Sequence, residues 1–333
     1  MIPRIAINGF GRIGRTVLRI LSARGGAEVV AINDISSPAE LAYLLKYDTV
    51  MGTFNRDVEA REGSLVVGGR AIRLLSERDP GRLPWKELGI DVVVEATGRF
   101  RKRAEIARHL DAGARKVILT VPAKDTIDAT VVIGVNDASL LPSHRIVSNA
   151  SCTTNCLAPV AKVLDEAFGI ERGMMTTIHA YTNDQRLADV PHKDLRRSRA
   201  AAENVIPTTT GAATAVGQVL PRLAGRLDGM AVRVPVPDGS LVDFVAILRS
   251  PATRESIHDA MRAAAGGPLS GILEYSEAPL VSSDVIGNPH SSVFDSPCTQ
   301  VLDRRAVKVI AWYDNEWGYS SRVADLIDRI ARN

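Results

Sequence analysis

Aromatic residues and cysteines are scarce in this chain of 333 residues. Phe, Trp and Tyr together make up 5% of it, and there are three cysteines. So few aromatic side chains argue against a surface on which single-stranded nucleic acid stacks. A small, odd number of cysteines in a long chain favours free thiols over a disulfide framework. Free thiols indicate a reducing compartment, and the cytoplasm is the default expectation.

Long hydrophobic runs and an excess of one charge are also missing. No run reaches the roughly 18 apolar residues of a membrane span, and the N-terminal MIPRIAINGFG lacks the features of a secretory signal. The 41 Lys and Arg residues nearly balance the 38 Asp and Glu residues, so no dedicated nucleic-acid surface is indicated. The six His and three Cys show no metal-ligand spacing, and we expect no metal. A chain of this length, 45% hydrophobic, is typical of a soluble two-domain protein.

The first half of the chain alternates short β-branched runs with longer helical patterns. This alternation is typical of βαβ units, so an α/β fold with a Rossmann doubly wound parallel sheet is predicted. The segment 58–75 instead alternates around three glycines and predicts a small antiparallel excursion. Strands are expected at 4–8, 28–33, 91–95, 116–120 and 130–135, and helices at 12–24 and 104–112.

The pattern changes near residue 150. Strands expected at 174–179, 230–234 and 241–248 are separated by long helices and a basic loop. This order predicts a second, α+β catalytic domain with a mixed or antiparallel sheet. Near the end of the chain, residues 321–331 place apolar side chains at helical spacing and predict an amphipathic helix.

A glycine motif lies between the first predicted strand and the first predicted helix. In the G-x-G-x-x-G sequence, Gly9 allows a tight turn, Gly11 lets backbone approach a pyrophosphate, and Gly14 lets helix pack close to strand. Asp34 follows the second strand, 34 − 14 = 20 residues past the last glycine, where an acid binds a ribose 2′-hydroxyl. The alternative for Asp34 is a solvated loop acid. A carboxylate at this point would repel a 2′-phosphate, so NAD is predicted rather than NADP.

The sequence SNASCTTNC at residues 148–156 sets a cysteine where a strand should give way to a helix. Ser151 is the expected helix cap, which places Cys152 in the first turn. A helix N-terminus or a nearby cation lowers a thiol pKa, so Cys152 is the candidate nucleophile. The alternative is that Cys152 and Cys156 are two buried side chains that only fill space.

A dinucleotide motif beside a nucleophilic cysteine predicts oxidation of an aldehyde through a thioester. Such a reaction needs a base, and His179 is the best candidate because it ends a predicted strand, 179 − 152 = 27 residues after the cysteine. The alternatives are that His179 is a core residue, or that the base is His144, His192 or His290.

Anion recognition is the other visible theme. Guanidinium groups match phosphate geometry, and LRRSR at 195–199, the hydroxyl cluster TTTG at 208–211 and Arg233 are candidates for phosphate binding. A run such as LRRSR is otherwise a solvated basic patch. Arg233 is the sharper signal because it lies within an apolar strand, where an unpaired charge is costly.

Seven segments together resemble phosphorylating glyceraldehyde-3-phosphate dehydrogenases: INGFGRIGR, SNASCTTNCLAP, TIHAYTNDQ, LRRSRAAA, IPTTTGAA, MAVRVP and AWYDNEWGYS. The resemblance implies a homotetramer with an NAD-binding domain at 1–151, a catalytic domain at 152–315, and a C-terminal helix at 316–333 that packs back on the first domain. It implies NAD-dependent oxidative phosphorylation of D-glyceraldehyde 3-phosphate to 1,3-bisphosphoglycerate in glycolysis or gluconeogenesis. Cys152 would then be the nucleophile and His179 its base.

The resemblance also assigns binding residues. Together with the glycine motif, it places around the cofactor Gly9, Gly11, Arg12, Ile13, Gly14, Asp34, Arg78, Thr120 and Asn315. Around the substrate and inorganic phosphate it places Ser151, Thr153, Thr182, Arg197, Thr210, Gly211 and Arg233. The sequence departs from the family's VPTPN at Val236 and Asp238 without removing a catalytic group.

Three rival interpretations remain. Erythrose-4-phosphate dehydrogenases share the cysteine motif, but AYTNDQ after His179 is more similar to the glyceraldehyde enzyme. An NADP-preferring biosynthetic enzyme is the second rival, and Val190-Pro191 resembles the NAD-preferring form of its loop. A nucleotide-binding or RNA-binding protein without activity is the third, and it predicts loss of Cys152 or His179, both of which are present.

Overall fold

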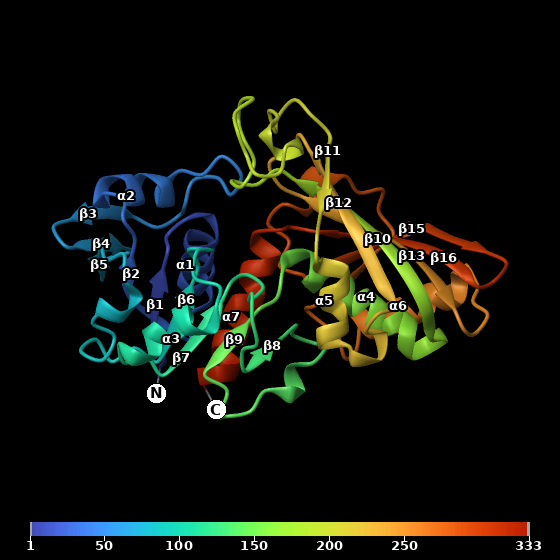
Figure 1. Cartoon of the computed structure of the whole chain (residues 1–333), viewed down its shortest axis with the longest axis horizontal. Coiled ribbons are helices and arrows are strands. Elements are labelled where there is room, and N and C mark those ends of the chain that lie inside the picture. The colour runs from blue at the N-terminus through green and yellow to red at the C-terminus, as the bar shows by residue number, and fades with distance from the viewer. Residues whose placement is uncertain (1, 332–333) are drawn as a thin grey trace. The chain divides into compact units, whose positions relative to one another are not determined.

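The computed structural model describes residues 2–331, which form two compact units. The first unit contains residues 2–131, 138–150 and 320–331, and the second contains residues 132–137 and 151–319. Among the described residues, no helix is both long and apolar enough to span a membrane. Figure 1 labels the elements along the chain.

The first unit is built on one sheet in the strand order β3-β4-β5-β2-β1-β6-β7-β9-β8. From β5 to β9 neighbouring strands are parallel, and their order is the one that defines a Rossmann sheet. The strands are β1 Arg4–Asn8, β2 Glu28–Asn33, β3 Val58–Arg61, β4 Ser64–Val67, β5 Arg70–Leu75, β6 Val92–Glu95, β7 Lys116–Leu119, β8 Ala129–Thr130 and β9 Ile146–Ser148. The predicted parallel sheet and its antiparallel excursion are confirmed, because β3, β4 and β5 pair antiparallel.

One strand prediction was wrong. Residues 130–135 were expected to continue the sheet, but only Ala129–Thr130 is strand. The chain turns directly afterwards, because the N–H of Val132 donates to Asn136 Oδ1 at 2.8 Å and the N–H of Val135 donates to the carbonyl of Val132 at 3.0 Å. Gly134 in this turn has φ +83°, a conformation that β-branched neighbours cannot share without strain. A short apolar run alone did not reveal the turn.

Four longer helices contribute to the first unit: α1 Arg12–Arg24, α2 Pro38–Lys46, α3 Arg103–Asp111 and the greater part of α7, Trp317–Ala331. Sequence reasoning missed α2, although Ser37 caps it, Pro38 opens it and Glu40 completes a capping box. In α7, Asp325 pairs with Arg24 at 2.7 Å and the carbonyl of Ile330 accepts from Lys116 Nζ at 3.1 Å. The last two residues of the predicted C-terminal segment lie outside the described residues.

The second unit has a sheet in the order β11-β12-β10-β13-β16-β15-β14. Its neighbours are parallel at β10–β12 and β14–β15 and antiparallel elsewhere, so the predicted mixed sheet is confirmed. The strands are β10 Ile170–Ala180, β11 Ile206–Thr209, β12 Leu227–Val234, β13 Ser240–Leu248, β14 Leu273–Ser276, β15 Ser292–Leu302 and β16 Ala306–Tyr313.

Three helices, α4 Cys152–Phe168, α5 Ala212–Val219 and α6 Arg254–Ala265, pack along this second sheet (Figure 1). The strands alternate as expected for a sheet covered on one side. Met175 and Phe244 are a cross-strand pair, each 1% exposed, whereas the neighbouring Met174 is 63% exposed. Short 3-10 segments complete the chain: η1 Pro80–Arg82, η2 Asp137–Ser139, η3 Arg196–Ser198, η4 Pro221–Leu223 and η5 Ser282–Val285.

Candidate active site

The glycine turn after β1 has an open backbone. A Cβ at Gly9, whose φ is +91°, would lie 2.7 Å from the backbone nitrogen of Thr97, and one at Gly14 would lie 2.2 Å from the carbonyl oxygen of Gly9. A Cβ at Gly11 would meet no atom within 4 Å. The first and third glycines therefore permit the close approach of turn, strand and helix, and the second leaves space in front of the α1 N-terminus. This is a cradle that fits a pyrophosphate.

Asp34 lies at the carboxyl end of β2, beside this turn. Its Oδ2 accepts the N–H of Phe10 at 2.7 Å, and its Oδ1 accepts the N–H of Ser36 at 2.9 Å. The carboxylate is therefore fixed in orientation by two backbone donors. An acid held at this edge of a Rossmann sheet can accept hydrogen bonds from a ribose diol.

Arg12, the first residue of α1, donates to both carboxylate oxygens of Asp48, at 2.8 and 3.0 Å. Burial pulls the pKa of Asp48 upward, but the hydrogen bonds from Arg12 and from the N–H groups of Met51 and Val50 lower it to about 2. Asp48 is therefore ionised at neutral pH. The Arg12 guanidinium is anchored by a charged partner beside the cradle.

A buried polar network lies at the carboxyl ends of β1 and β6. Glu95, with no exposed surface, accepts from Asn8 Nδ2 at 2.5 Å, from the N–H of Thr97 at 2.9 Å and from the Thr97 hydroxyl. Trp85 Nε1 donates to His109 Nδ1 at 3.0 Å, so the other ring nitrogen of a neutral His109 carries the proton and donates to Glu95 at 3.0 Å. Asn8 belongs to this network and directly precedes Gly9, so the network fixes the backbone at the start of the glycine turn.

The remaining cofactor residues predicted from the sequence fall into both units. Thr120 follows β7, and its hydroxyl donates to the carbonyl of Glu95 at 3.0 Å. Ile13 lies in the first turn of α1, and Arg78 is exposed beyond β5. Asn315 belongs to the second unit, where its Oδ1 accepts from the hydroxyl of Ser240 at 2.6 Å.

In the second unit, Cys152 Sγ lies 3.5 Å from His179 Nε2. Cys152 is the first residue of α4, and His179 stands near the end of β10. The predicted cap is confirmed, since Ser151 Oγ accepts the N–H of Thr154 at 3.0 Å. Pro159 lies within α4, as the sequence indicated. The fold therefore brings together the thiol and the imidazole that the sequence proposed as nucleophile and base.

The backbone just before this helix is strained. Ala150 has φ +54°, the left-handed region that a non-glycine residue enters at a cost of about 1 kcal/mol. Its N–H donates to Ser148 Oγ at 3.1 Å. Sequence reasoning missed this bend, because alanine carries no turn signal. The bend starts α4 directly at Ser151 and Cys152.

The electrostatics of the pair differ from the sequence expectation. A lowered thiol pKa was expected, but burial raises the pKa of Cys152, and the charge of Arg233 only partly opposes this. Burial, followed by the charge of Arg233, lowers the pKa of His179 to about 3. The pair at neutral pH is therefore a thiol beside a neutral imidazole. A neutral imidazole is able to accept the thiol proton when an electrophile arrives.

Arg233 and the carbonyl of Ala180 surround the other nitrogen of His179. In this parallel register Arg233 lies opposite His179, and its Nη1 is 2.6 Å from His179 Nδ1 and 3.0 Å from the carbonyl oxygen of Ala180. Nδ1 itself is 2.7 Å from the same oxygen. Nδ1 thus faces a donor, Arg233 Nη1, and an acceptor, the carbonyl of Ala180. When Nδ1 carries the proton and donates it to Ala180, Nε2 is left as the acceptor facing the thiol. That tautomer is the one a base requires.

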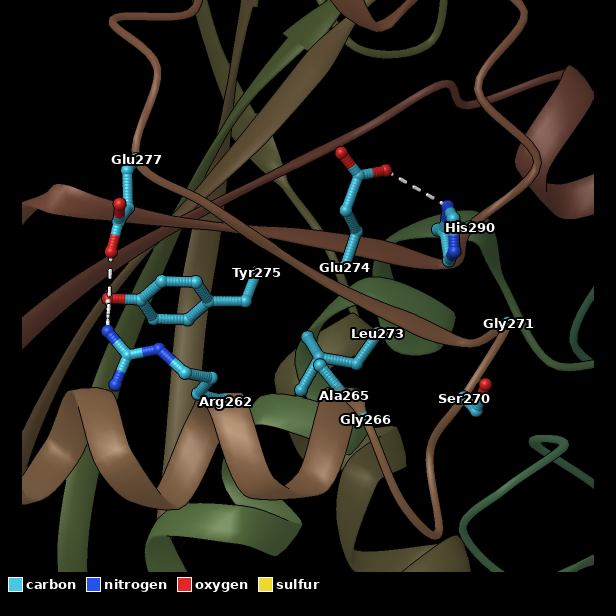
Figure 2. A pocket seen from close by; sticks show the side chains of 10 residues that line it. All are labelled: Arg262, Ala265, Gly266, Ser270, Gly271, Leu273, Glu274, Tyr275, Glu277 and His290. Carbon is cyan, nitrogen blue, oxygen red and sulfur yellow. Dashed lines mark hydrogen bonds and ion pairs between the residues drawn. The ribbon is translucent and has the colours of Figure 1, made fainter.

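The other histidines considered from sequence have different partners. His144 Nδ1 accepts the N–H of Leu141 at 3.3 Å, and His192 Nδ1 accepts the N–H of Asp194 at 2.9 Å. His290 lines a surface cavity of about 560 Å³, where it lies 3.0 Å from Glu274 (Figure 2). The structure therefore places His179 beside Cys152 and gives these three histidines local partners.

The same surface cavity contains none of the predicted site residues. Figure 2 shows Arg262 pointing toward Tyr275 and Glu277, with its guanidinium carbon 4.6 Å from the centre of the Tyr275 ring. Arg262 also pairs with Glu277 at 3.3 Å. The charged groups of this cavity are thus paired with one another, unlike the Cys152 site.

Arg197 lies within a network of acids and hydroxyls. Its Nε donates to Thr208 Oγ1 at 3.0 Å, and its Nη1 pairs with Asp184. Thr182 also donates to Asp184, which the sequence reasoning had not singled out. Burial pulls the pKa of Asp184 upward, but the Thr182 hydroxyl and the charges of Arg233 and Arg197 lower it overall. This cluster holds its arginine in a defined orientation.

The other predicted anion residues include hydroxyls and an incompletely paired arginine. Arg233 Nε is buried and has no hydrogen-bond partner among the described residues, so one of its donors remains for a ligand. Gly211 is the N-cap of α5, and Thr210 Oγ1 accepts the N–H of Ala212 at 3.2 Å. These are positive or donor-rich positions suited to phosphate.

Tyr313 is a residue that sequence reasoning missed. It is 1% exposed, and its hydroxyl lies 2.8 Å from Thr153 Oγ1 and 3.0 Å from Thr177 Oγ1. It therefore joins the end of β16 to the first turn of α4 and to β10. The segment AWYDNEWGYS contained the residue, but a buried tyrosine in a strand gave no separate signal of this role.

A dinucleotide-binding fold in one chain with a Cys–His pair defines a dehydrogenase class that oxidises aldehydes through a thioester. A family model described as "Glyceraldehyde 3-phosphate dehydrogenase, NAD binding domain" matches residues 3–103, and one described as "Glyceraldehyde 3-phosphate dehydrogenase, C-terminal domain" matches residues 151–315. The chain belongs to the glyceraldehyde-3-phosphate dehydrogenase family, and NAD is its cofactor. The resemblance seen in the sequence is confirmed.

Curated relatives match over nearly their whole length. A glyceraldehyde-3-phosphate dehydrogenase of Geobacillus stearothermophilus is 57% identical over 332 residues, which cover 99% of each chain. One of Mycobacterium avium is 56% identical over 340 residues, covering both chains completely, and glyceraldehyde-3-phosphate dehydrogenase 2 of Bacillus subtilis is 56% identical over 329 residues, 98% of this chain and 96% of the relative.

Proposed function

We propose that this chain is an enzyme that oxidises D-glyceraldehyde 3-phosphate with NAD+ and inorganic phosphate to 1,3-bisphosphoglycerate, in glycolysis or gluconeogenesis. The observation that carries the proposal is the 3.5 Å contact between Cys152 Sγ and His179 Nε2 in a chain of this family. The open glycine turn and the fixed carboxylate of Asp34 support the proposal that the chain binds NAD. Bound NAD+ supplies the acceptor for a hydride.

In the first half of the reaction, His179 Nε2 takes the thiol proton and the Cys152 sulfur attacks the aldehyde carbon. The proton passes to the carbonyl oxygen, and a hemithioacetal is formed. As the carbon loses a hydride, His179 takes the hydroxyl proton, and the carbon is left as a thioester on Cys152. General-base assistance of this kind contributes on the order of 10² to 10⁴ in rate.

In the second half, an oxygen of inorganic phosphate attacks the thioester carbon. The bond from carbon to Cys152 Sγ breaks, the sulfur leaves as thiolate and regains a proton, and the acyl phosphate is released. Arg233, with its unpartnered Nε, and Arg197, with Thr208 beside it, are proposed to hold the two phosphate groups. Ser151, Thr153, Thr182, Thr210 and Gly211 are proposed to complete these sites.

The test is phosphate-dependent NADH formation by the purified protein and by two matched cysteine variants. Cys152→Ser replaces the thiol by a hydroxyl and is expected to abolish turnover. A hydroxyl is a weaker nucleophile than a thiol, and an alkoxide is a poorer leaving group than a thiolate. Cys298→Ser changes an exposed thiol and is expected to retain turnover. Undiminished turnover in Cys152→Ser contradicts the proposal.

Substrate and cofactor choice require a separate measurement. We expect kcat/KM to be higher for NAD+ than for NADP+, because Asp34 would repel a 2′-phosphate. We also expect glyceraldehyde 3-phosphate to be preferred over erythrose 4-phosphate. A reversed order in either comparison favours the corresponding rival enzyme.

We propose a homotetramer, with the first domain at 1–151 and 316–333 binding NAD and the second at 152–315 catalysing. The uncovered face of the second sheet supports assembly, because Met174, Met230 and Val245 are 63%, 41% and 40% exposed on adjacent strands. Light scattering tests the assembly, and a monomeric mass contradicts it. We also propose a cytoplasmic location, since free Cys152 must stay reduced to react.

A further inference from the structure

Two buried carboxyl groups face each other in the second unit. Asp238, between β12 and β13, and Asp314, just after β16, are each 1% exposed, and their carboxyl groups lie close enough to form a hydrogen bond when one of them is protonated. Carboxylates accept hydrogen bonds and cannot donate them, so two ionised groups cannot make this contact. One of the two must carry a proton.

The partners of the two groups show which one carries it. Asp314 accepts three backbone N–H groups, those of Gly287 at 2.7 Å, Glu316 at 2.8 Å and Trp317 at 2.6 Å. Asp238 accepts one, from Gly239 at 2.8 Å. No donor among the described residues reaches Asp238 Oδ2. Three N–H donors stabilise the charge on Asp314, so the proton belongs on Asp238.

The pair is held by rigid backbone. Gly239 has φ +80°, and a Cβ there would lie 2.0 Å from the carbonyl oxygen of Ser282 in η5. The loop that carries Asp238 therefore packs directly on η5. Asp314 reaches Gly287, just beyond η5, so one hydrogen-bonded pair ties the β12–β13 loop, the end of β16 and the η5 segment together.

This junction lies beside the predicted cofactor and base residues. Ser240, two positions after Asp238, accepts the N–H of Ala180 at 3.1 Å and donates to Asn315 Oδ1 at 2.6 Å. Asn315 directly follows Asp314, and Ala180 directly follows His179. The same short segments therefore carry both the acid pair and Asn315, which the family resemblance places around the cofactor.

We propose that Asp238 is a positioning residue for this reaction: its carboxyl group keeps a proton at neutral pH, donates it to Asp314, and so holds Asn315 in the orientation that binds the cofactor. The inference rests on the proposed function, because it takes Asn315 as one of the residues that bind NAD. Loss of the proton puts two charges in contact and releases this hold, so cofactor binding weakens at alkaline pH.

The electrostatics agree with this assignment. Burial, followed by the charges of Asp314 and Glu316, raises the pKa of Asp238 to about 9. The titratable groups that face Asp238 are Asp314 and Glu316 from the β16–α7 connection, and Cys152 from the start of α4. Cys152 is the nucleophile in the proposed function, and the charge of Asp238 would raise its pKa further. The test must therefore separate cofactor binding from thiol chemistry.

The experiment compares the full-length protein with D238N and D238A. Asparagine has the same shape and donates from an amide that does not titrate, so D238N is expected to retain the neutral-pH KM for NAD+ within about twofold. Above pH 9, the KM of the wild type should rise about tenfold per pH unit relative to that of D238N. D238A lacks the donor and should raise the KM at neutral pH, with a smaller effect on kcat. Identical pH profiles of KM for wild type and D238N overturn the inference.

Infrared spectroscopy of the cofactor-free protein tests the proton without turnover. The wild type should show the carbonyl stretch of a protonated buried carboxyl group at neutral pH, and D238N should lack it. If the protein is inactive but shows the band, the proposed function is contradicted, whereas the protonated state of Asp238 is supported. An active protein without the band overturns the inference, and this readout still decides if D238A does not fold.

Discussion

In the first unit, the buried Glu95 carboxylate has hydrogen-bond donors at both oxygens, from Asn8, His109 and Thr97. In the second unit, the partly buried Cys152 sulfur faces His179, and the buried Asp238 lies against another carboxyl group. The first arrangement pairs each group with its complement. The second holds an imidazole that stays neutral and a carboxyl group that stays protonated at neutral pH.

The two arrangements serve different tasks. A fully satisfied network fixes a backbone turn, and the glycine cradle above it needs only a rigid backbone and a helix N-terminus to bind an anion. Chemistry needs protons that can move, and strongly shifted pKa values cluster where they do. In the second unit they occur at Cys152, His179 and Asp238, whereas the lowered pKa of Asp48 in the first unit comes from hydrogen bonds donated by Arg12 and two backbone N–H groups.

The largest expected effect comes from removing the proposed base in the second unit. His179→Asn should lower kcat by a factor on the order of 10² to 10⁴, because the thiol and hydroxyl protons lose their acceptor. His192→Asn is the matched control, since His192 contacts its own loop, and it should leave kcat nearly unchanged. Steady-state kinetics with saturating substrates measure both variants. A loss of kcat in the His192 variant alone would move the base to the other loop.

The next largest effect concerns the stability that the buried network around His109 gives the first unit. His109→Phe puts an apolar and slightly larger ring in a fully buried position and removes one hydrogen-bond partner each from Trp85 Nε1 and Glu95, so it should lower the free energy of unfolding by about 2–4 kcal/mol. Denaturant unfolding measures this, and the kcat of the folded fraction should be retained. His144→Phe, at a partly exposed position, is the control and should have a much smaller effect. Equal stability of the two variants would refute the structural role of the network.

The pH dependence of stability is a smaller effect for each pH unit. The folded pKa of Asp238, about 9, lies above the unfolded value of about 3.9, so the folded state binds an extra proton between these values. The contribution of Asp238 to stability is therefore complete below about pH 4 and declines as pH rises toward 9, by on the order of 1 kcal/mol per unit.

The D238N variant isolates this contribution. It should unfold at a higher temperature than the wild type above neutral pH, and the difference should shrink on acidification. Scanning calorimetry of both proteins across this range provides the measurement. A wild type that gains stability relative to D238N as pH rises would mean that Asp238 is ionised in the folded state.

The smallest effect concerns the surface cavity. Arg262→Ala removes a side chain that pairs with Glu277 and Tyr275 (Figure 2), and it should leave kcat/KM within about twofold of the wild type. The expected result follows because the charged partners of Arg262 remain solvated. A large rise in KM for the aldehyde would show that this cavity takes part in binding.

Local signals in the sequence predicted much of both regions. The glycine motif, the cap at Ser151 and the alternation of strand and helix patterns depend on neighbouring residues, and the structure confirms them. The failures have equally local causes. The strand expected at 130–135 is interrupted by a turn whose acceptor is the Asn136 side chain, and α2 was missed although its capping box was present.

The candidate site was predictable to a lesser extent. The sequence singled out Cys152 and placed His179 first among four candidate histidines, but spacing alone did not exclude the other three. It also missed Ala150, because alanine carries no turn signal, and Asp184, whose partners Thr182 and Arg197 come from its own loop. Tyr313 was missed because its role depends on contacts with distant segments. Tyr313 reaches residues 160 and 136 positions away along the chain.

By itself the sequence determined the α/β class, the dinucleotide turn, a candidate nucleophile and the family. Hydrophobic periodicity, glycine conformations and long motifs are properties of adjacent residues, and they survive without a folded structure. Only the tertiary structure decided that His179 is the imidazole beside Cys152, that burial raises the thiol pKa, and that Asp238 meets Asp314. Those properties depend on desolvation and on distances of a few ångströms between segments remote in sequence, which a linear pattern does not contain.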